Sequence, residues 1–140
     1  MNLDSLWIEG VLVQEQVMGG REVILGMARD RQFGRLLIFG LGGIYVEALK
    51  DVTFRIAPLA RAEAAAMIRE VHAFPILQGL RGESPADLAA LVEDILRLRL
   101  SQLVTNFPEI AEIDINPLLV RPKGEGTVAL DARIKLGRNK

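Results

Sequence analysis

The sequence predicts an α+β fold, in which helices cover one face of a mostly antiparallel sheet. Three observations favour it. Short β-branched runs separated by turn residues fill the chain up to Ile56, two amphipathic helical stretches follow, and a closing hairpin ends the pattern. At 140 residues, the chain is one domain or a large part of one.

Composition narrows the class of protein. Half of the residues are hydrophobic and 25% are charged, which is typical of a globular domain. The net charge of −1 and the lack of a basic run give no support to nucleic-acid binding. No apolar run reaches the roughly 18 residues of a membrane span, and the N-terminus has no signal-peptide pattern. The chain has no cysteine, which fits the cytoplasmic location that we expect.

The first strands are predicted to form a hairpin. Residues 1–9 are weakly patterned and read as a lead-in or as the boundary of an excised domain. Gly10–Val17 alternates apolar and polar residues, so it is predicted to be a strand. Met18–Gly20 is a turn signal, and Arg21–Ala28 is predicted as the partner strand.

A glycine-rich loop follows the next apolar strand, Leu36–Phe39. The segment Gly40–Gly43 has three glycines in four residues, which lets backbone N–H groups approach an anion closely. Its spacing matches neither a P-loop nor a dinucleotide fingerprint, so a tight turn is the alternative. Another strand is predicted at Val52–Ile56, and Pro58 ends it.

Two helices are predicted between this strand and the closing hairpin. Ala60–Val71 has apolar residues at helical spacing, and the connector Phe74–Gly82 is expected to be irregular. Ser84, as N-cap, and Pro85, in the first turn, are expected to start a helix that runs to about Phe107.

The closing hairpin carries the strongest candidate site. Its first arm, Glu112–Val120, places Asp114 and Asn116 on one face because they are two residues apart. Asp131, on the returning arm Thr127–Arg133, is expected opposite them within a residue or two of register. Two carboxylates and an amide oxygen form a hard-oxygen cluster that suits Mg²⁺. The alternative is a structural polar cluster satisfied by backbone donors.

The run from Glu112 to Leu118, followed by a turn and Ala129–Arg133, resembles the metal-binding end of an ATP-grasp domain. The closer resemblance is to the β part of NDP-forming acyl-CoA synthetases, such as ADP-forming acetyl-CoA synthetase and, more distantly, the succinyl-CoA synthetase β subunit. It extends over residues 10–136, which we assign to the C-terminal ATP-grasp subdomain, and leaves 137–140 as a tail.

The resemblance implies ATP or ADP and Mg²⁺ as ligands and assigns roles by position. Asp114, Asn116 and Asp131 are expected to hold Mg²⁺. The hinge that reads the adenine edge maps to Glu15, Gln16 and Val17. The carboxylate that binds the ribose maps to Glu22. Gly42 and Gly43 become a candidate phosphate-side or subunit-contact loop. Because the family's phosphohistidine lies in a glycine-rich loop on the α-type part, we assign His72, the only histidine, a structural role.

The implied parent reaction converts acyl-CoA, ADP and phosphate into carboxylate, CoA and ATP through a phosphohistidine. Only nine residues precede Gly10, so the chain is expected to lack both the N-terminal ATP-grasp subdomain and the CoA-binding α-type part. It is therefore expected to be inactive alone. Two alternatives stay open: a synthetase-like regulatory domain of a protein-lysine acetyltransferase, and a non-catalytic binding or assembly module.

Overall fold

The structure, a computed structural model, describes residue 7 and residues 9–43, 50–97 and 106–137. Its elements in these ranges are the strands β1 to β6 and the helices α2 to α4, in the order β1 (Arg21–Asp30), β2 (Gly34–Leu41), β3 (Val52–Ile56), α2 (Arg61–Arg69), α3 (Phe74–Leu77), α4 (Leu88–Arg97), β4 (Ile110–Val120), β5 (Thr127–Ala129) and β6 (Ala132–Leu136). None of the helices in the described part is long and apolar enough to cross a membrane.

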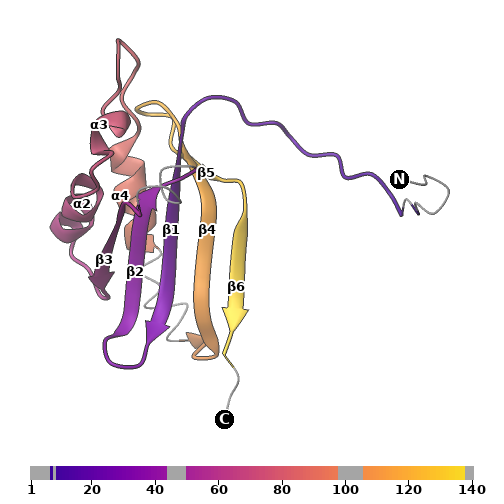
Figure 1. The fold of residues 1–140 in the computed structure, drawn as a ribbon, viewed down its shortest axis with the longest axis vertical. Coiled ribbons are helices and arrows are strands. Elements are labelled where there is room, and N and C mark those ends of the chain that lie inside the picture. The colour runs from indigo at the N-terminus through magenta and orange to yellow at the C-terminus, as the bar shows by residue number, and fades with distance from the viewer. Residues whose placement is uncertain (1–6, 8, 44–49, 98–105, 138–140) are drawn as a thin grey trace.

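One antiparallel sheet organises the chain. Its strands follow the order β3-β2-β1-β4-β5, and β6 also pairs with β4. Figure 1 shows the helices behind this sheet and along its β3 side, with the other face turned toward the viewer. The predicted α+β class, with helices on one face of an antiparallel sheet, is confirmed.

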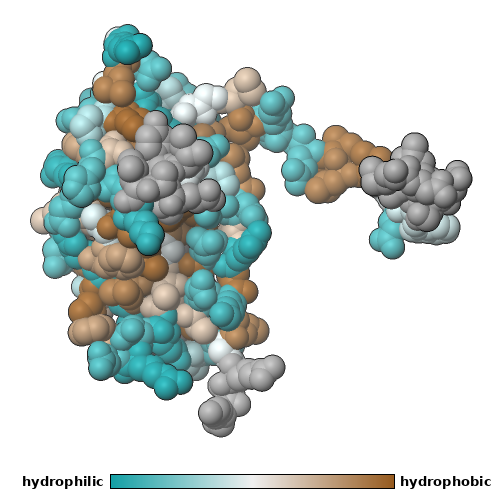
Figure 2. Space-filling view, in the orientation of Figure 1, coloured by the Kyte–Doolittle hydropathy of each residue, from teal (hydrophilic) through white to brown (hydrophobic). Residues whose placement is uncertain are grey.

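Alternation along the strands separates the two faces of the sheet. On β1 the residues Val23, Leu25 and Met27 are buried toward the helices, on what we call the inner face. Glu22 and Gly26 belong to the opposite, outer face. Leu91 and Ile95 of α4 are fully buried in the same core as the inner face. Figure 2 shows that the outer face is mixed, with hydrophobic residues toward β3 and hydrophilic residues toward β4 and β6.

The predicted strand at Gly10–Val17 is wrong. This segment is extended but pairs with no described strand, and Val11, Leu12 and Val13 are among its highly exposed residues. Figure 1 shows it as an arm that leaves the sheet at the start of β1. A strand needs a neighbour for its backbone N–H and C=O groups, and the described part of the chain supplies none here.

The helix predicted to start at Ser84 begins at Leu88 instead, because Asp87 is its cap. Oδ1 of Asp87 accepts a hydrogen bond from the backbone N–H of Ala90 at 3.1 Å. Residues 98–105 of the predicted helix lie outside the described part, and Phe107 is not helical.

Two further sequence predictions need smaller corrections. The connector predicted to be irregular includes the short helix α3. The returning arm is not continuous, because Leu130 and Asp131 separate β5 from β6.

Candidate functional site

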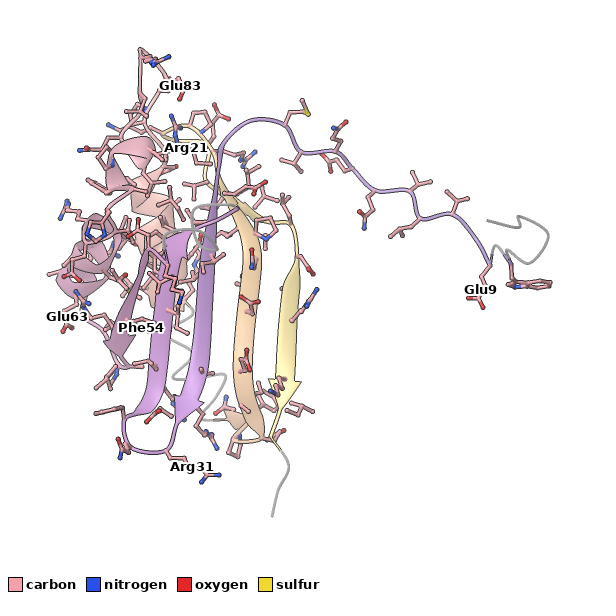
Figure 3. All side chains as sticks on the ribbon, viewed as in Figure 1. Glu9, Arg21, Arg31, Phe54, Glu63 and Glu83 are labelled. Carbon is pink, nitrogen blue, oxygen red and sulfur yellow. The ribbon has the colours of Figure 1, made fainter. Side chains whose placement is uncertain are left out.

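The outer face of β4 carries the predicted polar row. Ile113 and Ile115 pack toward the core, so Asp114 and Asn116 project from the opposite side of the strand. Asp114 is partly buried and Asn116 is exposed. Figure 3 shows oxygen-bearing side chains along β4 on the face toward the viewer. The shared face of these two residues agrees with the sequence prediction.

Asp131 comes to this row through the β4–β6 pairing. The backbone N–H of Asn116 donates a hydrogen bond to the backbone C=O of Asp131 at 3.1 Å. One pair further along, Ile115 is opposite Ala132, and Asp114 is opposite Arg133. The structure therefore places Asp131 beside Asn116, at the depth expected from the sequence.

A local irregularity in β4 shapes this part of the sheet. Val23 of β1 is opposite Leu118, whereas Leu25 is opposite Ile115, so two β4 residues face one β1 residue. The two β4 residues of this bulge are Asn116 and Pro117, which lie opposite Ile24 of β1. The bulge keeps both Leu118 and Ile115 on the core side while Asn116 stays on the outer face.

A hollow of about 260 Å³ lies beside the polar row. Gly26 is directly opposite Asp114, and a Cβ atom there would lie 3.1 Å from the backbone oxygen of Ile113 and 4.0 Å from Oδ1 of Asp114. The glycine thus leaves open space under the carboxylate. The residues that line the hollow come from β1, β2 and β4 and combine apolar with oxygen-bearing side chains: Ile24, Gly26, Met27, Ala28, Ile38, Glu112, Ile113, Asp114 and Asn116.

Glu22 and the glycine loop are also neighbours. The backbone N–H of Gly42 donates to the C=O of Glu22 at 2.7 Å, and a Cβ atom at Gly42 would lie 3.0 Å from Cβ of Glu22. Gly43 has a φ of +68°, a conformation that favours glycine. The structure therefore joins two predicted parts of the site, the ribose carboxylate and the glycine loop.

The two groups of candidate residues lie on one face of the sheet. Glu22 and Gly26 are four residues apart on β1, a separation of about 13 Å along the strand. Asp114, opposite Gly26, is therefore about that far from Glu22 along the sheet. An elongated ligand on the outer face can contact both ends.

The predicted hinge residues lie apart from the other candidates. Glu15 and Gln16 are exposed and Val17 is half-buried, all on the arm that leaves the sheet. Figure 1 shows the arm extending away from the strands that carry the polar row. The structure thus brings together Glu22, Gly42 and Gly43, and separately Asp114, Asn116 and Asp131, but not the arm.

The donor set fits a hard cation. Asp114 and Asp131 supply carboxylate oxygens and Asn116 an amide oxygen, the ligand types that Mg²⁺ takes while keeping several waters. The hollow of about 260 Å³ beside Gly26 and Asp114 leaves room for such a hydrated ion. In the described part of the chain, no three His, Cys, Asp or Glu side chains group as a metal site. Zinc-type coordination is not indicated there, whereas Mg²⁺ needs only one or two carboxylates.

The structure contains two buried carboxylates, Asp51 and Asp87, whose structural role the sequence did not predict. Asp51 accepts hydrogen bonds from the backbone N–H groups of His72 and Ala73, each at 2.8 Å, and lies 3.1 Å from Nδ1 of His72. Burial acts to raise the pKa of Asp51, but these hydrogen bonds and the His72 ring prevail and lower it. The side chain of His72 is 96% exposed, so Asp51 holds one ring nitrogen while the rest of the ring faces solvent.

Asp87 is the second such carboxylate. Besides capping α4, it accepts hydrogen bonds through Oδ2 from the backbone N–H groups of Gly124 and Gly126, at 2.9 and 3.0 Å. Its position just before an apolar helical run was a usable capping signal in the sequence. The link to the β4–β5 turn, 37 residues away, had no such signal.

An ATP-grasp domain family matches residues 3–136 of the chain. ADP-forming acetate–CoA ligase I of Archaeoglobus fulgidus is 55% identical over 130 residues, which are 93% of this chain and 18% of that protein. The β subunit of ADP-forming acetate–CoA ligase II of Pyrococcus furiosus is 52% identical over 92% of this chain and 54% of its own length. The chain thus spans from about a fifth to about half of these curated relatives.

Solved structures agree with the sequence relatives. Dinucleotide-forming acetyl-coenzyme A synthetase 1 of Ca. Korarchaeum cryptofilum, in complex with coenzyme A and Mg-AMPPCP, superposes with a TM-score of 0.78 at 43% identity. The match covers 86% of this chain and 55% of that chain. These findings confirm the family resemblance that was stated from the closing hairpin. By sequence and by fold, the chain belongs to the ATP-grasp domain family, and the relatives that it resembles include ADP-forming acetate–CoA ligases.

Proposed function

We propose that this chain is the nucleotide- and Mg²⁺-binding half of an ADP-forming acyl-CoA synthetase of the acetyl-CoA type. The parent reaction interconverts acyl-CoA, ADP and phosphate with carboxylate, CoA and ATP, through a phosphohistidine on another part of the enzyme. The observation that carries the proposal is the outer face of the sheet, where Asp114, Asn116 and Asp131 gather at one end and Glu22 meets Gly42 at the other.

Each end of this face has a distinct task. Asp114, Asn116 and Asp131 would hold Mg²⁺, which neutralises phosphate charge and fixes the geometry for phosphoryl transfer. Glu22 accepts hydrogen bonds from the ribose hydroxyls, since a carboxylate can accept both hydrogens of a diol. The backbone of Gly42 and Gly43 lies beside Glu22, where it can approach the nucleotide without a side chain in between.

The N-terminal arm supplies the adenine contacts in this proposal. Glu15, Gln16 and Val17 expose backbone groups that are paired with no described strand. An extended backbone presents alternating donors and acceptors that match a purine edge. We therefore propose that the arm forms the hinge once a second subdomain supports it.

The remaining parts of the enzyme are proposed partners. An N-terminal ATP-grasp subdomain would close over the outer face, and a CoA-binding part would carry the phosphohistidine. Relatives such as the Pyrococcus furiosus β subunit are about twice as long as this chain, which supports a second subdomain. The chain alone is expected to bind nucleotide without turning over, and the expected cytoplasmic location belongs to the same proposal.

Isothermal titration of the chain with ADP tests the proposal. We expect weak binding that requires Mg²⁺ and disappears with a chelator. Asp131→Ala is expected to lose this Mg²⁺-dependent binding while the circular dichroism spectrum stays unchanged. Asp30→Ala, at the end of β1, is the matched control and is expected to bind like the parent chain. Equal binding by all three chains would refute the metal assignment, and no binding by the parent would favour an assembly module.

A further inference from the structure

Strand β6 carries two positively charged side chains that lie opposite acidic residues of β4. Arg133 is the partner of Asp114 in the register, and Lys135 is the partner of Glu112. Directly opposed residues on paired strands project from the same face of the sheet. Both cations therefore belong to the outer face, and Arg133 is the one that stands beside the proposed metal ligands.

Arg133 contacts one of those ligands. Its Nε lies 3.8 Å from Oδ2 of Asp131, and the two side chains are 82% and 55% exposed. An ion pair with this exposure and distance is weak, so both groups can change partners at little cost. Arg133 thus neutralises a carboxylate of the cluster without being locked to it.

The arrival of a metal ion changes this balance. A divalent cation held by Asp114 and Asp131 repels a guanidinium on the neighbouring strand, and it removes the carboxylate charge that held Arg133. The phosphates of a bound nucleotide bring new negative charge to the same place. A guanidinium matches phosphate oxygens through two parallel N–H donors, which an ammonium group cannot do.

We propose that Arg133 is a positioning residue for the metal–nucleotide complex, an inference that rests on the proposed function. Without ligand, Arg133 holds the carboxylate of Asp131 and weakens binding of a bare metal ion. With the metal–nucleotide complex, Arg133 releases Asp131 to the metal and donates to a phosphate oxygen. The residue thereby favours the complex over the free cation at this site.

Lys135 provides the matched control. It carries the same charge, lies two residues along the same strand and face, and pairs with Glu112 at 3.7 Å. Glu112 is not among the proposed metal ligands. Removing the positive charge at Lys135 changes the net charge of the chain as much as removing it at Arg133.

The test compares Arg133→Gln and Lys135→Gln with the parent chain. Mn²⁺ alone is titrated and followed by the free-ion electron paramagnetic resonance signal, and MgADP is titrated by calorimetry. Arg133→Gln is expected to bind Mn²⁺ about threefold more tightly, because a repulsive charge is gone. It is expected to bind MgADP about tenfold more weakly, because a charge-assisted hydrogen bond is lost.

The control variants separate this role from a general charge effect. Lys135→Gln is expected to stay within twofold of the parent for both ligands. Arg133→Lys keeps the charge but not the paired donors, so it is expected to restore parent-like Mn²⁺ affinity and only part of the MgADP affinity. Opposite signs for the two ligands are a readout that loss of structure would not produce.

The outcomes that overturn the two proposals differ. If the parent chain binds MgADP but Arg133→Gln matches it for both ligands, the inference is wrong and the proposed function stands. Equal shifts in Arg133→Gln and Lys135→Gln also overturn the inference, since they show a long-range charge effect. A parent chain that binds neither Mn²⁺ nor MgADP overturns the proposed function, and the role of Arg133 with it.

Discussion

Asp87 ties two distant pieces of backbone together with one side chain. Its two oxygens accept hydrogen bonds from the first turn of α4 and from the turn between β4 and β5. The backbone N–H groups of Ala90 and Gly126 lower the pKa of Asp87, against the opposing effect of burial. The charged carboxylate is therefore part of the folded state.

Replacing Asp87 by Ala is expected to destabilise the fold by about 3 kcal/mol, from the lost cap and the unpaired turn N–H groups. Because the folded-state pKa is lowered, this contribution is complete above the unfolded value of about 4 and is lost as the pH falls through the folded-state pKa. Urea unfolding between pH 7 and pH 3 measures it. A parent-to-variant gap that stays constant on acidification contradicts the role of the charge.

At the scale of elements, the helices and strands of the core bury their apolar side chains, whereas the arm exposes its own. Leu91 of α4 is fully buried, whereas Leu12 of the arm is 80% exposed. Salt bridges add ties between elements, such as the one at 2.9 Å between Arg21 at the start of β1 and Glu83 before α4, both labelled in Figure 3. Since Glu83 is largely exposed, this pair adds little compared with core packing.

The same substitution at these two leucines is expected to change the free energy of unfolding by very different amounts. Leu91→Ala removes buried methyl groups and leaves a cavity, which costs about 2–5 kcal/mol. Leu12→Ala removes no core contact and is expected to stay within about 0.5 kcal/mol of the parent. Urea midpoints of the two variants measure the difference. A large loss in Leu12→Ala would show that the arm packs on the domain in solution.

At the scale of the whole molecule, the sheet has one face joined to helices and one face that the described helices leave open (Figure 1). The arm adds exposed apolar side chains, among them Val11, Leu12 and Val13. Exposed apolar side chains gathered on one segment are typical of an interaction site. The arm and the outer face are therefore the parts of the chain that the proposed second subdomain would cover.

Removing residues 1–18 is expected to leave the free energy of unfolding unchanged, since the described arm pairs with no strand. The same deletion is expected to weaken MgADP binding at least tenfold if Glu15, Gln16 and Val17 contact the adenine edge. Thermal unfolding and calorimetry measure the two effects separately. Unchanged MgADP affinity would contradict the hinge assignment without touching the metal site.

The sequence by itself determined most of the local elements and the family. Alternation of apolar residues located β1, β3 and β4, and the spacing of Asp114 and Asn116 fixed their common face, because a strand repeats every two residues. The length of the closing hairpin placed Asp131 at the right depth, since pairing register follows from the turn.

Only the tertiary structure decided which residues meet across the fold. Apolar alternation in Gly10–Val17 favoured a strand, but a strand forms only where another backbone pairs with it, and none of the described residues does so. The contacts of Glu22 with Gly42, of Asp51 with His72 and of Asp87 with Gly124 join residues far apart in the chain. Such contacts depend on how strands and helices pack, and local sequence patterns carry no record of that packing.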